Sequence, residues 1–77
     1  MNSPPKIDPI AIIPRACMDE ALPHLHDMAH LIEVCRHYSE IDDAAGFYVA
    51  CEKIIEHARD LAKIQKTMRL SFNERNK

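Results

Sequence analysis

The longest uninterrupted helical pattern in the chain runs from Ala44 to Leu70, and it limits the fold more than any other feature. Apolar side chains recur there at steps of three and four residues, which places them on one side of a 3.6-residue helix. The stripe comprises Phe47, Cys51, Ile54, Ala58, Leu61 and Met68, widened by Tyr48, Ile55 and Ala62. The opposite side is charged, no proline interrupts the run, and Ser39, Asp42 and Asp43 precede it as candidate caps. We therefore predict one long amphipathic helix over residues 44–70.

A second stripe of the same kind precedes the first and predicts a second helix. Its members are Leu22, Leu25, Met28, Ala29, Ile32, Cys35 and Tyr38, flanked by Ala21, Leu31 and Val34. Pro14 could occupy the first helical position with Pro23 as a kink, or the helix could open near Glu20 with Pro23 in its first turn. We favour the second alternative and a helix over residues 20–38. A turn of about four residues, 39–42, would make the two helices antiparallel neighbours.

The N-terminal segment has a different character, because residues 1–14 contain four prolines. Each proline lacks a backbone donor and disfavours a helical conformation in the residue before it. We therefore predict an extended arm over residues 1–14, a helical hairpin domain over 15–70 and a frayed tail over 71–77. The arm is also apolar, through Ile7, Ile10, Ile12 and Ile13. We favour an arm that lies across the groove of its own helical body and fills it. The alternatives are that the arm docks on another subunit or pairs as an added strand.

The size and composition of the chain indicate an all-α fold that self-associates. A 77-residue domain rarely gains more than about 3–5 kcal/mol from its core alone, so oligomerisation is expected. The chain is 47% hydrophobic and has one glycine, too few for a fold with several tight β-turns. One hairpin would leave apolar side chains uncovered, namely Leu31, Val34, Tyr48 and Ile55. We therefore predict a homodimer in which two hairpins form a four-helix bundle.

Charge is distributed unevenly along the chain, although the net charge is only −2. Residues 1–52 hold three basic and nine acidic side chains, a balance of −6, and residues 53–77 hold seven and three, a balance of +4. A basic edge follows the second helix through Arg59, Lys63, Lys66 and Arg69. This asymmetry favours attraction between antiparallel helices or dimer mates. A DNA-associated regulator that uses the basic edge is the alternative, although nucleic acid is not the expected partner because few charges and aromatic residues accompany it.

The histidines and cysteines give no complete site. His26 and His30 stand four residues apart, like the two histidines of a zinc-binding H-E-x-x-H motif, but aspartate replaces the glutamate and no third ligand is specified. They are the nearest candidates, and we predict no metal or other cofactor. Cys17, Cys35 and Cys51 are expected to be reduced thiols, since an odd number at these spacings does not form a disulfide framework. A turn centred near Glu40 would also keep Cys35 and Cys51 too far apart for a disulfide.

No arrangement of residues indicates catalysis. Cys35 and His37 stand two residues apart and so point to different sides of a helix, and one glycine cannot form a phosphate-binding loop. We predict a non-enzymatic regulator or adaptor, chaperone-like or an anti-activator, that binds an unidentified protein and has no small-molecule substrate. Its predicted contact surface comprises Ile10, Ile12, Ile13, Leu31, Val34, Tyr48 and Ile55. Without a signal-peptide pattern or an apolar run of about 20 residues, the expected location is the cytoplasm, with no membrane contact.

The layout as a whole resembles a group of short bacterial proteins of unknown function that are common in pseudomonads. The matching features are Pro4-Pro5-Lys6, Glu20-Ala21-Leu22, the acidic turn Glu40-Ile41-Asp42-Asp43, an aromatic residue near the start of the second helix, and Ile55-x-x-Ala58-x-x-Leu61. They cover residues 4–62, and the chain departs from the group in its longer, basic C-terminal end. The resemblance implies an N-terminal arm followed by a helical hairpin, and no assigned activity.

Overall fold

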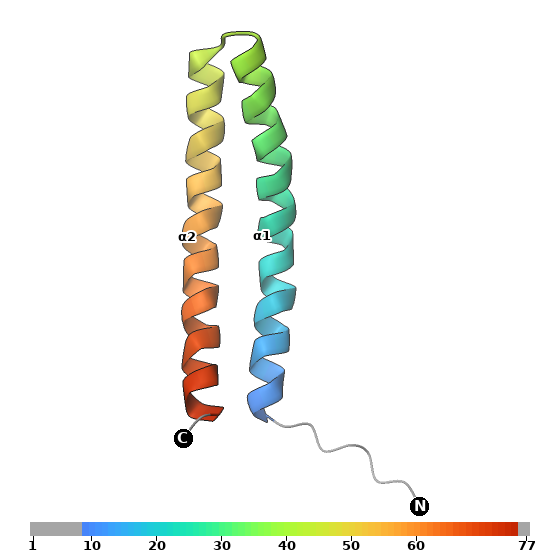
Figure 1. The fold of residues 1–77 in the computed structure, drawn as a ribbon, viewed down its shortest axis with the longest axis vertical. Helices are drawn as coiled ribbons and strands as arrows, with labels where there is room; N and C mark the ends of the chain where they lie inside the picture. The colour runs from blue at the N-terminus through green and yellow to red at the C-terminus, as the bar shows by residue number, and fades with distance from the viewer. Residues whose placement is uncertain (1–8, 76–77) are drawn as a thin grey trace, which may run out of the picture.

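The protein forms an antiparallel hairpin of two long α-helices (Figure 1). This computed structural model describes the backbone of residues 9–75 and the side chains of residues 12–74. α1 spans Pro9–Glu40 and α2 spans Ala44–Arg75. At a rise of about 1.5 Å per residue, each 32-residue helix is about 48 Å long. The two helices lie side by side along their whole length, which confirms the predicted all-α hairpin. Neither helix, over the described residues, has an apolar stretch long enough to cross a membrane.

The turn between the helices is shorter than predicted, because α1 continues to Glu40. Asp42 has a φ of 56°, in the left-handed region, and its backbone N–H donates to the carbonyl of Ser39 over 3.2 Å. The N–H of Asp43 donates to the carbonyl of Tyr38 over 2.9 Å. These two bonds form a Schellman motif that closes α1. Asp43 then caps α2, since its Oδ1 accepts from the N–H of Gly46 over 3.0 Å.

The predicted extended arm is wrong for its second half. Residues 9–14 are helical, and α1 contains both Pro14 and Pro23. Pro9 is the first helical residue, where a missing N–H has little consequence. Each internal proline removes one helical hydrogen bond at a cost of about 3 kcal/mol. Packing along α2 offsets this cost, because Cys17, between the two prolines, is one of the most buried residues. The rest of the arm, including Ile7, lies outside the described residues.

The predicted frayed tail is also wrong for the residues that the structure describes. α2 extends beyond Leu70 to Arg75, and Ser71 is buried. The two corrections have one cause, since the start of α1 lies beside the end of α2 in the hairpin (Figure 1). Because α1 begins eleven residues earlier than predicted, the end of α2 has a helix to pack against.

A single row of residues from each helix forms the contact between them, which we call the seam. On α1 the seam consists of Cys17, Ala21, His24, Met28, Leu31, Cys35 and Tyr38. On α2 it consists of Ala50, Ile54, His57, Leu61, Ile64, Met68 and Ser71. Both rows alternate steps of four and three residues, which is the seven-residue repeat of a coiled coil. All fourteen residues are buried or half-buried.

The seam differs from the predicted core stripes. Leu22, Leu25, Ala29 and Ile32 were predicted to face α2, and the structure leaves all four exposed. Phe47 and Ala58 on α2 are likewise exposed, whereas Ile54, Leu61 and Met68 lie in the seam as predicted. Half of the fourteen seam residues have small or flexible side chains, and the other half are Leu, Ile, His and Tyr. The larger apolar stripe of α1 lies outside.

Gly46 illustrates how close the helices are near the turn. A Cβ atom at this position would lie 2.5 Å from Cδ1 and 2.8 Å from Cζ of Tyr38, so the ring would have to move. A glycine-to-alanine change in a helix normally stabilises it by up to about 1 kcal/mol. We expect Gly46→Ala to destabilise the hairpin instead, by about 1–3 kcal/mol, because the added methyl group overpacks the seam.

Urea unfolding, followed by circular dichroism at fixed chain concentration, measures this effect. The same change in a Tyr38→Ala background is the control, and there it should be stabilising. A stabilising effect of Gly46→Ala in the wild-type chain would show that Tyr38 does not pack on Gly46.

Candidate functional site

One side of the hairpin carries two parallel apolar stripes, which together we call the apolar face. The α1 stripe consists of Met18, Leu22, Leu25, Ala29 and Ile32. The α2 stripe consists of Ala44, Tyr48, Cys51, Ile55, Ala58 and Ala62. Both stripes alternate steps of four and three residues, so each follows a helix as regularly as the seam does. Apart from the half-buried Cys51, every member is exposed.

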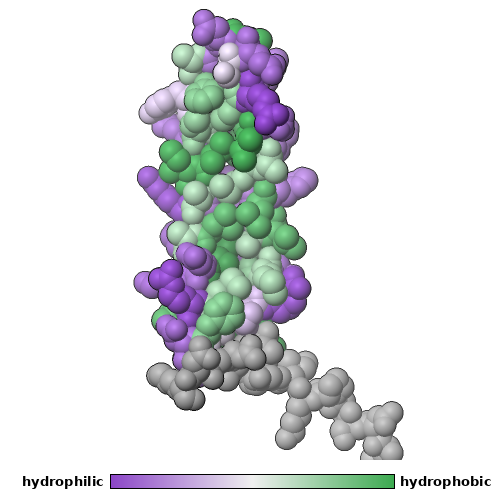
Figure 2. All heavy atoms as spheres, in the orientation of Figure 1, coloured by the Kyte–Doolittle hydropathy of each residue, from purple (hydrophilic) through white to green (hydrophobic). Residues whose placement is uncertain are grey.

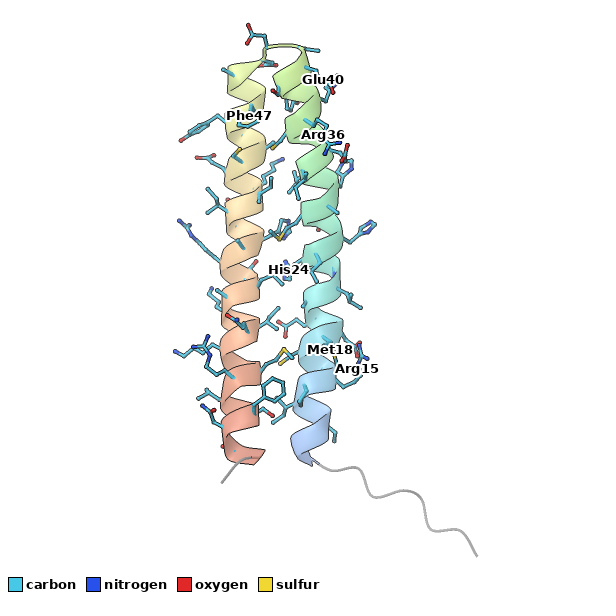
Figure 3. All side chains as sticks on the ribbon, viewed as in Figure 1. Arg15, Met18, His24, Arg36, Glu40 and Phe47 are labelled. Carbon is cyan, nitrogen blue, oxygen red and sulfur yellow. The ribbon has the colours of Figure 1, made fainter. Side chains whose placement is uncertain are left out.

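The two stripes lie on the same side of the molecule. Met18, Leu25 and Ile32 each directly follow a seam residue of α1, and Cys51 and Ala58 each directly follow a seam residue of α2. Equivalent positions of an antiparallel helix pair lie on the same face, because a two-fold axis normal to that face relates the helices. Figure 2 shows the result as an apolar band over both helices, edged by polar side chains, and Figure 3 labels Met18 on this side.

The other side of the hairpin is more polar, chiefly in the half that lies away from the turn. A hollow of about 190 Å³ there is lined by Cys17, Glu20, His24, Asp60, Lys63, Ile64 and Thr67. Nearer the turn, a second hollow is lined by Leu31, Val34, Tyr38, Asp43, Ala45, Gly46, Val49, Ala50 and Lys53. The hairpin is therefore two-sided, with its continuous apolar surface on one side only.

The structure separates the residues that the sequence suggested as a contact surface. Tyr48 and Ile55 belong to the apolar face, as a contact role requires. Leu31 and Val34 are half-buried within the hairpin, beside the second hollow. Ile12 and Ile13 are exposed at the start of α1, and the side chain of Ile10 lies outside the described residues.

The seam also holds a polar cluster that sequence reasoning missed. His24 and His57 approach each other to 2.9 Å between their Nδ1 atoms, and their rings meet edge to face with centroids 5.1 Å apart. Asp60 Oδ2 lies 3.9 Å from His24 Nδ1, and Asp27 Oδ2 lies 3.8 Å from His57 Nε2. The predicted candidates His26 and His30 are exposed and outside the seam. His24 and His57 share the spacing of the seam, which is the signal that could have identified them.

Cys35 and Cys51 are close neighbours, contrary to the prediction. Their Sγ atoms lie 3.9 Å apart, and both are free thiols. The prediction was wrong because it centred the turn near Glu40, whereas the turn lies beyond that residue and brings Cys51 opposite Cys35. Burial raises the pKa of the Cys35 thiol above its ordinary value, and the adjacent Cys51 thiol raises it further.

Alkylation should distinguish Cys35 from an ordinary cysteine. Only the thiolate reacts, and a raised pKa leaves less thiolate at a given pH. At pH 8 we expect iodoacetamide to modify Cys35 at least several-fold more slowly in the folded protein than in the same chain unfolded in guanidinium. Peptide mass spectrometry over time measures the rate at each cysteine. Equal rates at Cys35 in the folded and unfolded chain would contradict the burial of this thiol.

The predicted basic edge lies on the surface of α2. Arg59, Lys63, Lys66 and Arg69 are all exposed on α2. Asp60 lies between Arg59 and Lys63, Glu52 and Glu56 precede the edge on the same helix, and Lys63 borders the first hollow together with Asp60. The edge is thus a mixed-charge surface, which suits a solvated helix or a protein contact.

Comparison with protein-family models, curated proteins and solved structures found no match to this chain. The resemblance to short pseudomonad proteins stays a prediction.

Proposed function

We propose that this protein is a protein-binding module whose apolar face packs on a second copy of the chain, so that two hairpins form a four-helix bundle. The observation that carries the proposal is the regular second stripe on each helix. Its alternating steps of four and three residues are those required for helix-to-helix packing. A stripe that merely resulted from scattered surface residues would not keep this repeat over about four turns of α1 and about five turns of α2.

The burial of the isolated hairpin supports the same proposal. Among the side chains of residues 12–74, none is fully buried, and thirteen large apolar side chains are exposed. The buried apolar residues are Cys17, Cys35, Ala50 and Ile64. Such a core is small even for a chain of this length. A second hairpin on the apolar face would give each chain the inner layer that it lacks.

The free energy gained by burying the apolar face is comparable to the cost of bringing two chains together. Six large side chains of the apolar face are each about half exposed: Met18, Leu22, Leu25, Ile32, Tyr48 and Ile55. Full burial of such a side chain contributes about 1.5–3 kcal/mol, so the exposed halves contribute about 5–9 kcal/mol per chain. Two chains therefore gain about 9–18 kcal/mol, against an association cost of about 4–15 kcal/mol. The gain exceeds the cost over most of this range, and a micromolar dissociation constant, which needs a net gain of about 8 kcal/mol, lies within it.

Charge favours a second copy as the occupant. α1 carries two basic and five acidic side chains, a balance of −3, and α2 carries six and four, a balance of +2. In a two-fold dimer that places α1 of one chain over α2 of the other, helices of opposite net charge lie against each other. Such a bundle would act as an adaptor or regulator by presenting its outer residues, among them Ile12 and Ile13, to another protein.

A photo-crosslinking residue at position 25 tests the proposal. We expect irradiation of the purified protein to give a covalent dimer, with crosslinks in peptides of the α2 stripe, residues 44–62. The same probe at Lys63, which is exposed outside the apolar face, is the matched control and should give little dimer. Equal crosslinking from both positions, or crosslinks confined to one chain, would refute the apolar face as the contact surface.

A further inference from the structure

Two imidazoles meet in the middle of a seam that is otherwise largely apolar. The side chains of His24 and His57 are only 26% and 25% exposed. Figure 3 shows His24 extending from α1 toward α2. With 2.9 Å between the two Nδ1 atoms, one ring must donate and the other accept, or a cation must lie beside both nitrogens. Leucine or isoleucine would pack this position without any polar requirement, so the pair calls for an explanation.

Two carboxylates converge on the same histidines without forming hydrogen bonds to them. The distances of 3.9 Å from Asp60 to His24 and 3.8 Å from Asp27 to His57 are too long for hydrogen bonds. Ligand atoms of His24, His57 and Asp60 nevertheless all lie within 4.8 Å of one another. Three groups that ordinarily bind metals thus surround one point at the surface of the seam.

We propose that His24, His57 and Asp60 bind a divalent metal ion of the zinc class, which cross-links α1 to α2. In a tetrahedral zinc site with bonds of about 2.0–2.1 Å, neighbouring ligand atoms lie about 3.3 Å apart. The 2.9 Å and 3.9 Å separations bracket that value. Rotation of the three side chains that moves their ligand atoms by about an ångström would complete the site. The helices need not move.

The ligand chemistry selects the class of ion. Two imidazoles and one carboxylate suit zinc and its first-row neighbours, whereas calcium and magnesium prefer oxygen ligands. Asp27 has the position of an outer-shell partner, because it faces the Nε2 of His57 while the Nδ1 of His57 would bind the ion. A carboxylate behind a metal-bound histidine fixes the ring and raises its basicity. The adjoining hollow of about 190 Å³ has room for a water molecule as fourth ligand.

The ion would stabilise a hairpin whose own core is small. One ligand comes from α1 and two come from α2, so the ion would oppose separation of the helices near their midpoints. The site lies on the side opposite the apolar face. The inference is therefore independent of the proposed dimer, and each can fail without the other.

Zinc binding to the full chain, measured by competition with a chromophoric chelator, tests this inference. We expect one Zn²⁺ per chain with a micromolar or tighter Kd. His57→Gln should weaken binding at least a hundredfold, and Asp27→Asn should weaken it about tenfold to a hundredfold. Co²⁺ in place of Zn²⁺ should give the visible absorption of a tetrahedral site, and circular dichroism verifies that each variant remains helical.

The matched control is the double variant His26→Ala with His30→Ala, which removes the exposed histidine pair and leaves the seam unchanged. We expect its zinc affinity to stay within about threefold of the wild type, since neither residue lies in the cluster. If this double variant loses zinc while His57→Gln keeps it, the ion binds the exposed pair. That result, or the absence of zinc binding at 100-fold excess over the chain, would overturn the inference.

Discussion

Leu25→Asp should convert the proposed dimer into folded monomers. Leu25 lies at the centre of the α1 stripe and is 49% exposed in the single hairpin. In the monomer the new carboxylate would remain hydrated, so the hairpin should keep its helicity. In the bundle the same carboxylate would be buried without a partner, at a cost of about 3 kcal/mol or more per site. We therefore expect the dissociation constant to rise at least about a hundredfold, since 1.4 kcal/mol corresponds to a factor of ten.

Val49→Asp is the matched control for this experiment. Val49 is 50% exposed, and the substitution introduces the same charge into a helix, but the residue borders the hollow on the other side of the hairpin. Size-exclusion chromatography with light scattering should show an unchanged dimer for Val49→Asp and a monomer for Leu25→Asp. If both variants dissociate, or neither does, the contact between copies does not lie on the apolar face.

Ile64→Ala should have the largest effect on folding. Ile64 is the largest of the buried apolar residues, at 7% exposure. Truncation of a buried isoleucine costs about 2–5 kcal/mol through lost burial and the cavity left behind. This is comparable to the whole core stability of about 3–5 kcal/mol that a domain of this size can supply. We therefore expect a chain that is largely unfolded, or that unfolds at much lower urea concentration.

Leu70→Ala is the comparison for Ile64→Ala. Leu70 is 57% exposed on the same helix, six residues away, and belongs neither to the seam nor to the apolar face. Its truncation should change stability by no more than about 0.5 kcal/mol. Urea unfolding of both variants at one chain concentration measures the change in the free energy of unfolding. Similar losses for the two would mean that Ile64 is not part of the inner packing.

The hairpin itself could be predicted from the sequence, because its signals are local. The start of α2 follows from Asp43, which forms the predicted type of cap, and the direction of the chain follows from a short turn. Ile54, Leu61 and Met68 were assigned to the helix contact correctly, since only one apolar stripe of α2 contains them. Each of these inferences depends on residues no more than one turn apart.

The choice between two apolar stripes on α1 could not be made in the same way. Leu25 and His24 are adjacent, and periodicity alone does not decide which of the two faces α2. Hydrophobicity predicts that the stripe with Leu25 faces α2, whereas in the structure the stripe with His24 does so. The reason is tertiary, because the register of the hairpin decides which row of α1 lies against α2, and His24 there meets His57, 33 positions along the chain.

Long-range effects also explain why the start of α1 and the histidine cluster were not predicted. Local rules disfavour a helix across Pro14 and Pro23, and the partner helix beside them outweighs this preference. The histidine cluster joins residues 33 positions apart, so its detection requires the register of the hairpin. The spacing of His26 and His30 within one helix was visible in the sequence, whereas the approach of His24 to His57 was not.

Sedimentation equilibrium of the wild-type chain in a metal chelator tests the central claim most directly. The chelator removes any contribution from bound zinc, so the apolar face alone determines the mass. At micromolar concentration we expect a species of twice the 8.8 kDa chain mass, which dissociates on dilution. A single 8.8 kDa species at every concentration up to about 1 mM, the range of very weak association, would contradict the account.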